Sequence, residues 1–225
     1  MSKKVWLVTG CSKGLGKALV EELIAQGYPV AGTSRSKESL EKSIGAESDL
    51  FLPLSMNVKE EADVKKAIAQ ATEKFGRIDV VVNNAGFTHL ATIEEMSDAD
   101  AREEFDINVF GTLNVIRGAL PQMRAQGSGH IFNVSSLGAY NVGPLSGIYC
   151  ATKHAVKAIS ETLAQEVKAF GIHVTDVKPG FMKTEFFGSS HKTTAPEGSP
   201  YKHLYDENMK FYMGQNGNQA GEKGR

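Results

Sequence analysis

The sequence predicts an α/β fold, a single doubly wound parallel sheet with helices on both of its faces. Short apolar runs typical of buried strands alternate with segments of helical periodicity from residue 5 to about residue 180. No repeat, low-complexity tract or linker interrupts this alternation. The chain has 225 residues, of which 41% are hydrophobic, and this is enough for one substantial core but not for two domains with a linker.

The elements follow each other in a regular order. The expected strands span residues 5–8, 28–33, 50–56, 78–82, 130–134 and 172–177. A helix after the first strand ends at Gly27 and carries one apolar stripe, made of Leu15, Ala18, Leu19 and Leu23. A helix after the third strand ends at Gly76, and its apolar positions are Val64, Ile68, Ala71 and Phe75. Right-handed crossovers between parallel strands place a ligand site beyond the carboxyl ends of the strands.

The part of the chain after about residue 188 is different. It begins with a polar, turn-rich stretch, continues with residues 201–214, which could form a helix, and ends in a run rich in glycine and charge. No seventh strand is expected. The strand at residues 172–177 would therefore be an edge of the sheet. Because an uncovered edge promotes association, either the chain is a shortened form or a partner covers this edge.

Charge and cysteine content exclude several function classes. A formal net charge of −1 and a pI near 6.6 provide no basic surface for nucleic acid or an anionic membrane. The apolar run that starts at residue 5 is too short for a signal sequence or a membrane span. Cys11 and Cys150 form neither a disulfide framework nor a metal-binding spacing. We expect a cytoplasmic protein without a metal site, a nucleic-acid partner or membrane contact.

A glycine-rich turn, TGCSKGLG, joins the first strand to its helix. Gly10, Gly14 and Gly16 would let the backbone approach a pyrophosphate, at which the first N–H groups of the helix point. The spacing is TG-x3-G-x-G and not G-x-G-x-x-G. Glycines in such a turn can also be purely structural, but the order of strand, turn and amphipathic helix favours a dinucleotide site.

The end of the second strand indicates which dinucleotide binds. Sites of this type usually place a carboxylate there, which hydrogen-bonds the adenosine ribose. Residues 31–34 contain no carboxylate, Arg35 follows them, and Lys13 lies in the glycine turn. Because two cations would attract a 2′-phosphate, we expect NADP(H) to be preferred over NAD(H). The alternative is that both side chains are solvated surface charges.

Tyr149 and Lys153 are four residues apart in IYCATK, a spacing that puts both side chains on one face of a helix. An ammonium beside a phenol favours the phenolate and lowers the pKa of a group that ordinarily titrates at about 10. The pair could then exchange a proton near neutral pH. Together with a dinucleotide site, this predicts hydride transfer between a coenzyme and a carbonyl or alcohol.

These motifs, in this order, resemble those of the short-chain dehydrogenase/reductase family, which has a Rossmann-type fold. TGCSKGLG resembles the coenzyme turn, NNAG at residues 83–86 the strand-four motif, and YxxxK the acid–base pair. The resemblance covers residues 5–187. It implies a catalytic set of Asn108, Ser136, Tyr149 and Lys153. It implies a coenzyme-binding set of Gly10, Ser12, Lys13, Gly14, Leu15, Gly16, Arg35, Asn57, Val58, Asn84, Ala85, Gly86, Tyr149, Lys153, Pro179, Gly180 and Thr184.

The resemblance also implies a division of the chain. Residues 1–187 would form the dinucleotide-binding and catalytic part, and residues 188–225 the substrate loop and an incomplete C-terminal segment of the same domain. The last helix and seventh strand, which in relatives complete the sheet and often contribute to oligomer contacts, are missing. A homo-dimer or homo-tetramer is expected.

A role for each catalytic residue follows from the resemblance. Tyr149 would donate a proton to the carbonyl oxygen in reduction or accept one in oxidation. Lys153 would lower the tyrosine pKa and hydrogen-bond the nicotinamide ribose, while Ser136 would hold the substrate oxygen. Asn108 would position a water that links Lys153 to solvent. The structural alternatives are a core tyrosine, a serine that caps the next turn and an asparagine on a helix surface.

At the adenine end, Asp79 resembles an acid that steadies that side of the site. The family commonly has Asp-Val after strand three, whereas this chain has Asn57-Val58, so a weaker or altered adenine contact is expected. His89 either borders the substrate pocket or lies in a solvated loop. His154 is expected to point away from the catalytic face, into packing or to the surface.

The substrate loop is expected at residues 185–205, together with residues 137–145. Apolar side chains in these stretches favour an apolar ketone or alcohol, and they are Phe186, Phe187, Leu145, Val142 and Tyr140. A non-catalytic NADP-binding regulator would not need the four catalytic residues, and a nucleotide-sugar epimerase or dehydratase would need a sugar-binding domain for which the chain has no room. We therefore predict an NADP(H)-dependent oxidoreductase that interconverts a ketone or aldehyde and an alcohol.

Overall fold

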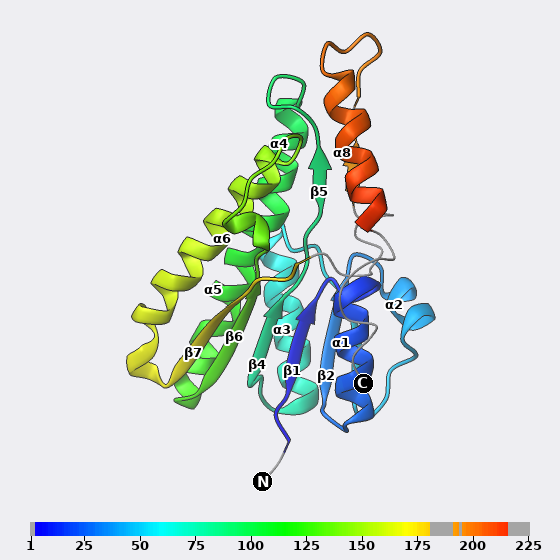
Figure 1. Cartoon of the computed structure of the whole chain (residues 1–225). Coiled ribbons are helices and arrows are strands. Elements are labelled where there is room, and N and C mark those ends of the chain that lie inside the picture. The colour runs from blue at the N-terminus through cyan, green and yellow to red at the C-terminus, as the bar shows by residue number, and fades with distance from the viewer. Residues whose placement is uncertain (1–2, 181–190, 194, 216–225) are drawn as a thin grey trace, which may run out of the picture.

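A computed structural model describes residues 3–180, 191–193 and 195–215 of the chain. Six parallel strands form the central sheet in the order β3-β2-β1-β4-β6-β7 (Figure 1). Their bounds are Trp6–Thr9 for β1, Val30–Ser34 for β2, Phe51–Ser55 for β3, Val80–Asn83 for β4, Gly129–Val134 for β6 and Ile172–Val177 for β7. Each predicted strand is present, so the predicted α/β fold with a parallel sheet is confirmed.

Helices connect the strands of the main sheet, and one more helix follows the last of the described strands. They are α1 (Gly14–Ala25), α2 (Lys37–Ser43), α3 (Glu61–Phe75), α4 (Asp98–Phe105), the π-helical turn η1 (Asp106–Gly111), α5 (Thr112–Gln126), the short turn η2 (Leu137–Ala139), α6 (Gly147–Glu166), the short turn η3 (Lys168–Phe170) and α8 (Lys202–Gln215). The helix expected at residues 201–214 is therefore confirmed as α8. No helix in the described ranges is both long and apolar enough to cross a bilayer.

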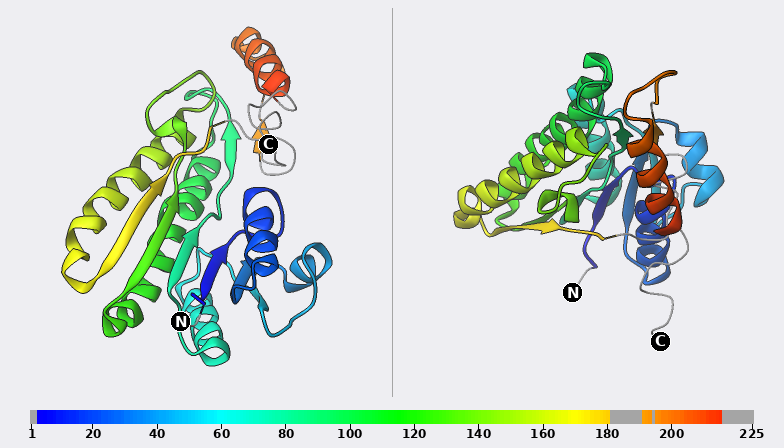
Figure 2. Two further views of the ribbon diagram at one scale, coloured as in Figure 1. Left: turned by 60° about the horizontal axis from the view of Figure 1, so that its bottom comes forward. Right: turned by 45° about the horizontal axis from the view of Figure 1, so that its top comes forward.

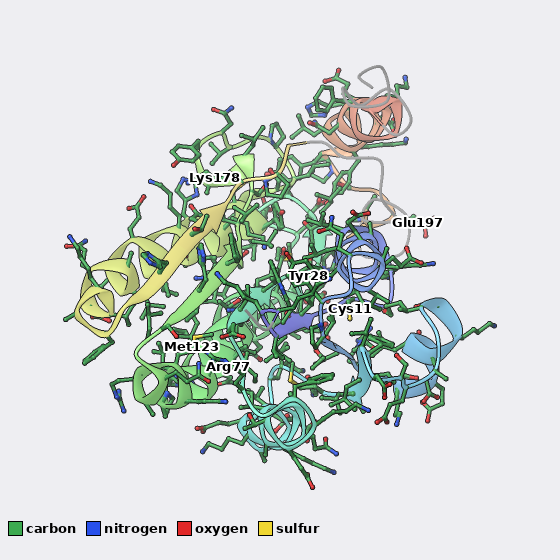
Figure 3. The ribbon with its side chains drawn as sticks, turned by 90° about the horizontal axis from the view of Figure 1, so that it is seen from below. Cys11, Tyr28, Arg77, Met123, Lys178 and Glu197 are labelled. Carbon is green, nitrogen blue, oxygen red and sulfur yellow. The ribbon has the colours of Figure 1, made fainter. Side chains whose placement is uncertain are left out.

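Two apolar layers hold the sheet, because successive side chains of a strand point to opposite faces. Leu7, Val81 and Ile131 belong to a cluster that includes the apolar faces of α3 and α5. Val8 and Val80 belong to a second cluster, which includes the buried side of α1. Figures 2 and 3 show these helices on opposite sides of the sheet. The fold is thus doubly wound, with helices on both faces.

The strand order reverses at β1, whose neighbours are β2 and β4. At this point the ends of β1 and β4 are tied together by short polar groups. The hydroxyl of Thr9 accepts hydrogen bonds from the backbone N–H groups of Asn84 and Ala85, both at 3.0 Å. The side-chain amide of Asn84 donates to the carbonyls of Thr9 and Gly10, at 3.0 and 2.9 Å. Because ligands of doubly wound sheets bind where the strand order reverses, these bonds shape the site.

A second, two-stranded sheet lies beyond the carboxyl ends of the main strands. It pairs β5 (Thr88–Leu90) with β8 (His191–Thr193) in parallel register. Sequence analysis missed both strands, because three residues are too few to show an alternating pattern. In the described part of the chain β7 is an edge of the main sheet, as expected.

Gly10, in the glycine turn, has no room for a side chain. Its φ of +65° is left-handed, and a Cβ there would lie 2.7 Å from Cα of Ala85. Gly76, which ends α3, has φ of +80° but no atom within 4 Å of such a Cβ.

Gly76→Ala should therefore lower the free energy of unfolding by about 1 kcal/mol, the cost of a left-handed alanine. Gly10→Ala should lower it by about 2–4 kcal/mol, because the clash adds to this cost.

Urea unfolding of both variants measures the difference between the two glycines. Equal losses for Gly10→Ala and Gly76→Ala would show that the contact with Ala85 carries no cost.

Candidate active site

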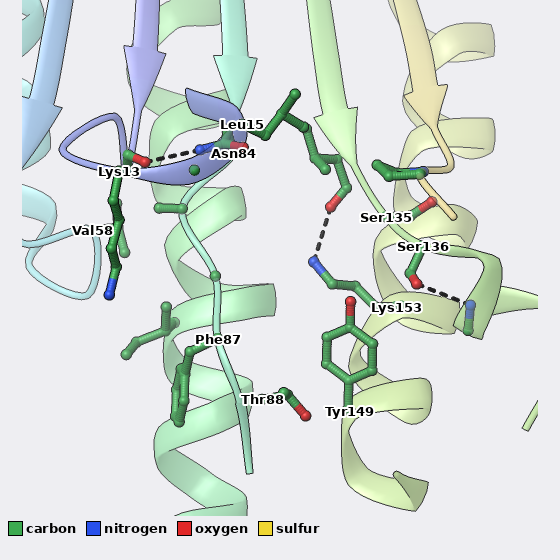
Figure 4. A pocket seen from close by; sticks show the side chains of 18 of the residues that line it. Lys13, Leu15, Val58, Asn84, Phe87, Thr88, Ser135, Ser136, Tyr149 and Lys153 are labelled. Atoms are coloured by element: carbon green, nitrogen blue, oxygen red, sulfur yellow. Dashed lines mark hydrogen bonds between the residues drawn. The ribbon is translucent and has the colours of Figure 1, made fainter. Parts of the chain in front are cut away.

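A cavity of about 830 Å³ opens at the carboxyl ends of the strands (Figure 4). This volume lies in the range of cofactor and substrate sites. Its walls come from the residues that follow all six strands of the main sheet and from the first turns of α6. The fold thus brings together segments that are up to 201 residues apart in the chain, from Gly10 to Phe211.

The glycine turn forms one wall of this cavity. Gly10, Ser12, Lys13, Gly14 and Leu15 line it, as predicted. Because α1 begins at Gly14, its first N–H groups are available to an anion in the cavity. The bare glycine surface leaves room for a pyrophosphate against the backbone, so the turn fits a dinucleotide.

Gly16 was also expected to contact the coenzyme, but it does not line the cavity. It is buried behind the turn, where a Cβ would lie 2.5 Å from the side-chain nitrogen of Asn84 and 2.7 Å from the carbonyl oxygen of Gly10. Gly16 therefore allows α1 to pack closely against the end of β4. The motif alone does not separate this packing role from a contact with the coenzyme.

Past the end of β2, the cavity wall is polar and carries no carboxylate. Arg35 lines it and is exposed. Ser34, Ser36 and Ser39 line it as well, and sequence analysis did not single them out. Ser36 caps α2 by accepting a hydrogen bond from the N–H of Ser39 at 3.1 Å. Because these serines lie within four residues of Arg35 in the sequence, their hydroxyl groups could have been predicted to line the same wall.

At the next strand end, Asn57 and Val58 line the cavity as predicted. Asn57 already uses its side-chain oxygen in a local turn, where it accepts a hydrogen bond from the N–H of Lys59 at 3.3 Å. Asp79, which was expected on this side, is not there. Its carboxylate accepts hydrogen bonds from the N–H of Val5 at 2.9 Å and from Arg77 at 2.7 Å. That expectation is wrong, because Asp79 precedes β4 and so lies at the opposite end of the sheet.

Tyr149 and Lys153 lie on α6 with their side chains close together, as their spacing predicts. The Lys153 ammonium is 5.6 Å from the centre of the Tyr149 ring, and both residues line the cavity. Lys153 is only 6% exposed and donates a hydrogen bond to the carbonyl of Val134 at 2.9 Å. Burial lowers the pKa of Lys153 to about 8, although the charges of Glu104 and Asp176 act in the opposite direction.

Ser136 follows β6 and faces the same cavity. Figure 4 shows its hydroxyl and that of Tyr149 on the same side of the site as Lys153. The Ser136 oxygen accepts a hydrogen bond from the N–H of Gly138 at 3.0 Å, so it also caps the short turn η2. The structural alternative, a serine that caps the next turn, is therefore present, and the same residue also lines the cavity.

Asn108 is buried in η1, with 1% of its surface exposed, and does not line the cavity. Its side chain accepts from the N–H of Phe87 at 3.1 Å and donates to the carbonyl of Phe87 at 2.9 Å and to the hydroxyl of Thr152 at 3.1 Å. The alternative of a surface position is wrong. Asn108 ties the segment after β4 to α6, within one residue of Lys153.

The remaining coenzyme predictions fall into two groups. Ala85, Gly86, Asn84, Pro179 and Gly180 line the cavity. Thr184, together with Phe186 and Phe187 of the expected substrate loop, lies outside the described residues.

Part of the cavity lining is apolar, and it includes Phe87, Leu90, Leu137, Val142 and Phe211. Val142 was predicted there, and Phe211 comes from α8. Two expected residues are placed elsewhere. Leu145 is buried against Leu90 and Tyr205, and Tyr140 does not line the cavity.

The two histidines considered in the sequence, His89 and His154, have different surroundings. His89 is 3% exposed in β5 and does not line the cavity, so neither the pocket border nor the solvated loop is right. The short strand β5, which the sequence did not reveal, buries it. His154 is exposed on α6 and points away from the site, as expected.

Cys11 and Cys150 are free and buried, and burial raises the pKa of Cys11 to about 12. In the described ranges, no group of three potential ligands could hold a metal ion.

Comparison with known proteins identifies the family. The family model for short chain dehydrogenases matches residues 4–195. The chain is 39% identical to Oxidoreductase BOA17 of Botryotinia fuckeliana over 188 residues, which are 83% of this chain and 69% of that protein.

Solved structures agree with this match. A short-chain dehydrogenase from Streptomyces avermitilis superimposes with a TM-score of 0.87 and 37% identity, over 95% of this chain and 78% of that one. A 3-ketoacyl-(acyl-carrier-protein) reductase from Brucella melitensis, complexed with NADH, has a TM-score of 0.78 and 28% identity, over 81% and 78% of the two chains. ElxO with NADP bound has a TM-score of 0.77 and 32% identity, over 82% and 76%. With its nucleotide-sized cavity at the reversal of strand order and these relatives, the chain belongs to the short-chain dehydrogenase/reductase family of oxidoreductases, which act on CH–OH groups.

Proposed function

We propose that the protein interconverts a ketone or aldehyde and an alcohol with NADP(H), and that Tyr149 is the general acid and base. The observation that supports this most strongly is the juxtaposition of the Tyr149 ring with the buried ammonium of Lys153, at 5.6 Å, on the wall of the cavity. A cation held in a poorly solvated place acts strongly on a neighbouring phenol. This arrangement favours the phenolate and so makes proton exchange feasible near neutral pH.

The bound nicotinamide would supply or accept the hydride. The protein's part is to position the substrate and to move the proton. In reduction, the hydroxyl of Tyr149 donates its proton to the carbonyl oxygen, and in oxidation the phenolate accepts the proton of the alcohol. The hydroxyl of Ser136, on the same wall, donates a hydrogen bond to that oxygen, where negative charge develops in the transition state. Asn108 holds the backbone of Phe87 and the first turns of α6 in register, and we propose that a water it positions links Lys153 to solvent.

The preference for NADP(H) is supported by the wall around Arg35. This wall is lined by one exposed guanidinium and several hydroxyl groups and by no carboxylate. Because the hydroxyls of Ser34 and Ser36 already donate to the Ser36 carbonyl and to Glu38, Arg35 is the group that would attract a 2′-phosphate. Relatives were solved with either coenzyme, NADH in one and NADP in another. The charge of Arg35 is therefore the feature of this chain that we propose decides between them.

The substrate is proposed to be an apolar carbonyl compound or alcohol. The cavity that Tyr149 lines is also lined by Phe87, Leu137, Val142 and Phe211, and burial of apolar substrate surface against them would favour binding. A homo-dimer or homo-tetramer and a cytoplasmic location stay predictions from the sequence.

Tyr149→Phe tests the proton donor, because it removes the hydroxyl and keeps the ring. We expect kcat for NADPH-dependent reduction of ketones and quinones to fall by about 10²–10⁴-fold, with little change in NADPH binding measured by fluorescence. Tyr28→Phe is the matched control, since Tyr28 packs near Trp6 away from the cavity. Activity that survives in Tyr149→Phe contradicts the proposed acid. Binding of NADPH without turnover of any substrate by the unaltered protein would instead favour a regulator.

Arg35→Ala tests the coenzyme preference. A charge-assisted hydrogen bond contributes about 1.5–3 kcal/mol, so the ratio of kcat/KM for NADPH to that for NADH should fall by about 10–150-fold. The matched control is Lys37→Ala, because Lys37 does not line the cavity and pairs with Glu41 and Glu47. An unchanged ratio in Arg35→Ala would assign the preference to other groups.

A further inference from the structure

Glu104 is a buried carboxyl group that the proposed reaction does not use. It lies on α4, about one turn before Asn108, and 0% of its surface is exposed. Among the described residues, none reaches hydrogen-bond geometry with either of its carboxylate oxygens. Because a carboxylate without donors is costly in the protein interior, burial raises the pKa of Glu104 to about 8.

The surroundings of Glu104 connect it to the site. The hydroxyl of Thr88 and the N–H of His89, both in β5, lie close enough to lower the pKa of its carboxyl, but too little to offset burial. About one turn later on the same helical segment, Asn108 bonds Thr152 of α6. A Cβ on Gly86 would lie 3.1 Å from Oδ1 of Asn108 and 3.5 Å from Nζ of Lys153, so these two side chains converge on one point.

A further polar contact on α4 lies nearer the surface. About one turn before Glu104, the Oδ1 atom of Asp100 lies 3.3 Å from Nδ1 of His89, and the Asp100 side chain is 31% exposed. The segment β5 therefore contacts both the half-exposed Asp100 and the buried Glu104, the first through the His89 ring and the second through its backbone and Thr88.

The charges of Glu104 and Lys153 act on each other. The Lys153 ammonium lowers the pKa of Glu104, and the Glu104 carboxylate raises the pKa of Lys153. The other charged group that acts on Lys153 is Asp176 of β7, and Tyr149 is its titratable neighbour on α6. Below pH 8 Glu104 is mostly neutral. As the solution becomes alkaline, its carboxylate forms in the range where Lys153 would otherwise lose its proton.

We propose that Glu104 is a positioning residue for Lys153, and that the buried carboxylate of Glu104 keeps Lys153 protonated in alkaline solution. This rests on the proposed function of Tyr149 and Lys153, because only a charged Lys153 assists the phenol. Glu104 thus extends the alkaline range of the reaction without contacting the substrate or the coenzyme.

Glu104→Gln tests the proposal, since it keeps the shape of the side chain and cannot ionise. The measurement is kcat/KM against pH for NADPH-dependent reduction of the most active ketone. We expect the alkaline limb to move to lower pH by about one unit, the lower end of the effect of a nearby opposite charge. At pH 9 kcat/KM should then be about tenfold below that of the unaltered protein, whereas at pH 6.5 the two should agree within about threefold.

The matched control is Asp106→Asn, which removes an exposed carboxylate two residues later on the same segment and should leave the limb in place. A Glu104→Gln profile that overlays that of the unaltered protein, or an equal loss at every pH, overturns the proposal. If Glu104→Gln contradicts the proposal while Tyr149→Phe abolishes turnover in the same assay, only the inference on Glu104 falls. If Tyr149→Phe stays active, the proposed function falls and this inference falls with it.

Thermal unfolding adds a measurement that needs no substrate. The pKa of Glu104 is raised from 4.5 in the unfolded chain to about 8 in the folded one. The folded state therefore binds this proton more tightly, and its stability should decline as pH rises from about 4.5 to 8. The Tm of Glu104→Gln should accordingly rise relative to that of the unaltered protein over this interval, whereas a constant offset would contradict titration of Glu104. If Glu104→Gln does not fold, Glu104→Asp replaces it, because its side chain is shorter by one methylene and places the carboxylate farther from Lys153. Glu104→Asp should move the alkaline limb in the same direction. An unmoved limb would overturn the proposal.

Discussion

The site depends on one buried ammonium, that of Lys153. A cation in the interior needs partners that replace water. Lys153 finds the carbonyl of Val134 at 2.9 Å, the Tyr149 ring that it lies over at 5.6 Å, and the charges of Glu104 and Asp176. These partners come from β6, α6, α4 and β7, so satisfying one charge fixes how four elements meet. The phenol that we propose as the proton donor is positioned as a consequence.

The crevice that holds this ammonium is kept open by short polar side chains at the strand ends. Thr9 and Asn84 join β1 to β4 through four hydrogen bonds that leave the backbone of the glycine turn exposed to the cavity. Deeper in the sheet, Asn133 accepts from the amide of Asn83 and donates to Ser160 of α6, each at 2.8 Å. Because an unmade buried hydrogen bond is expensive, these contacts specify the register of β4, β6 and α6 more sharply than apolar packing does.

Much of this could be predicted from the sequence. The alternation of apolar runs and helical stripes predicted the six strands of the main sheet. The strands β1 to β4 are buried almost throughout and read as nearly continuous apolar runs, whereas β6 and β7 are only partly buried. The i and i+4 spacing placed Tyr149 and Lys153 on one helical face. Wrong expectations concern residues whose neighbours are distant in the chain. Asp79 lies at the amino end of β4, and His89 and Leu145 are buried by contacts with α4 and α8.

The sequence by itself determined the order of strands and helices, the glycine turn and the lack of a carboxylate after β2, since these follow from local periodicity and from which residue stands where. Only the tertiary structure decided that Gly16 packs against Asn84, that Asn108 lies behind the cavity wall and that Glu104 is buried near Lys153. The physical reason is that burial and the pKa values it shifts depend on which segments fold over a side chain. A charged residue such as Glu104 has the same local pattern whether water or protein surrounds it.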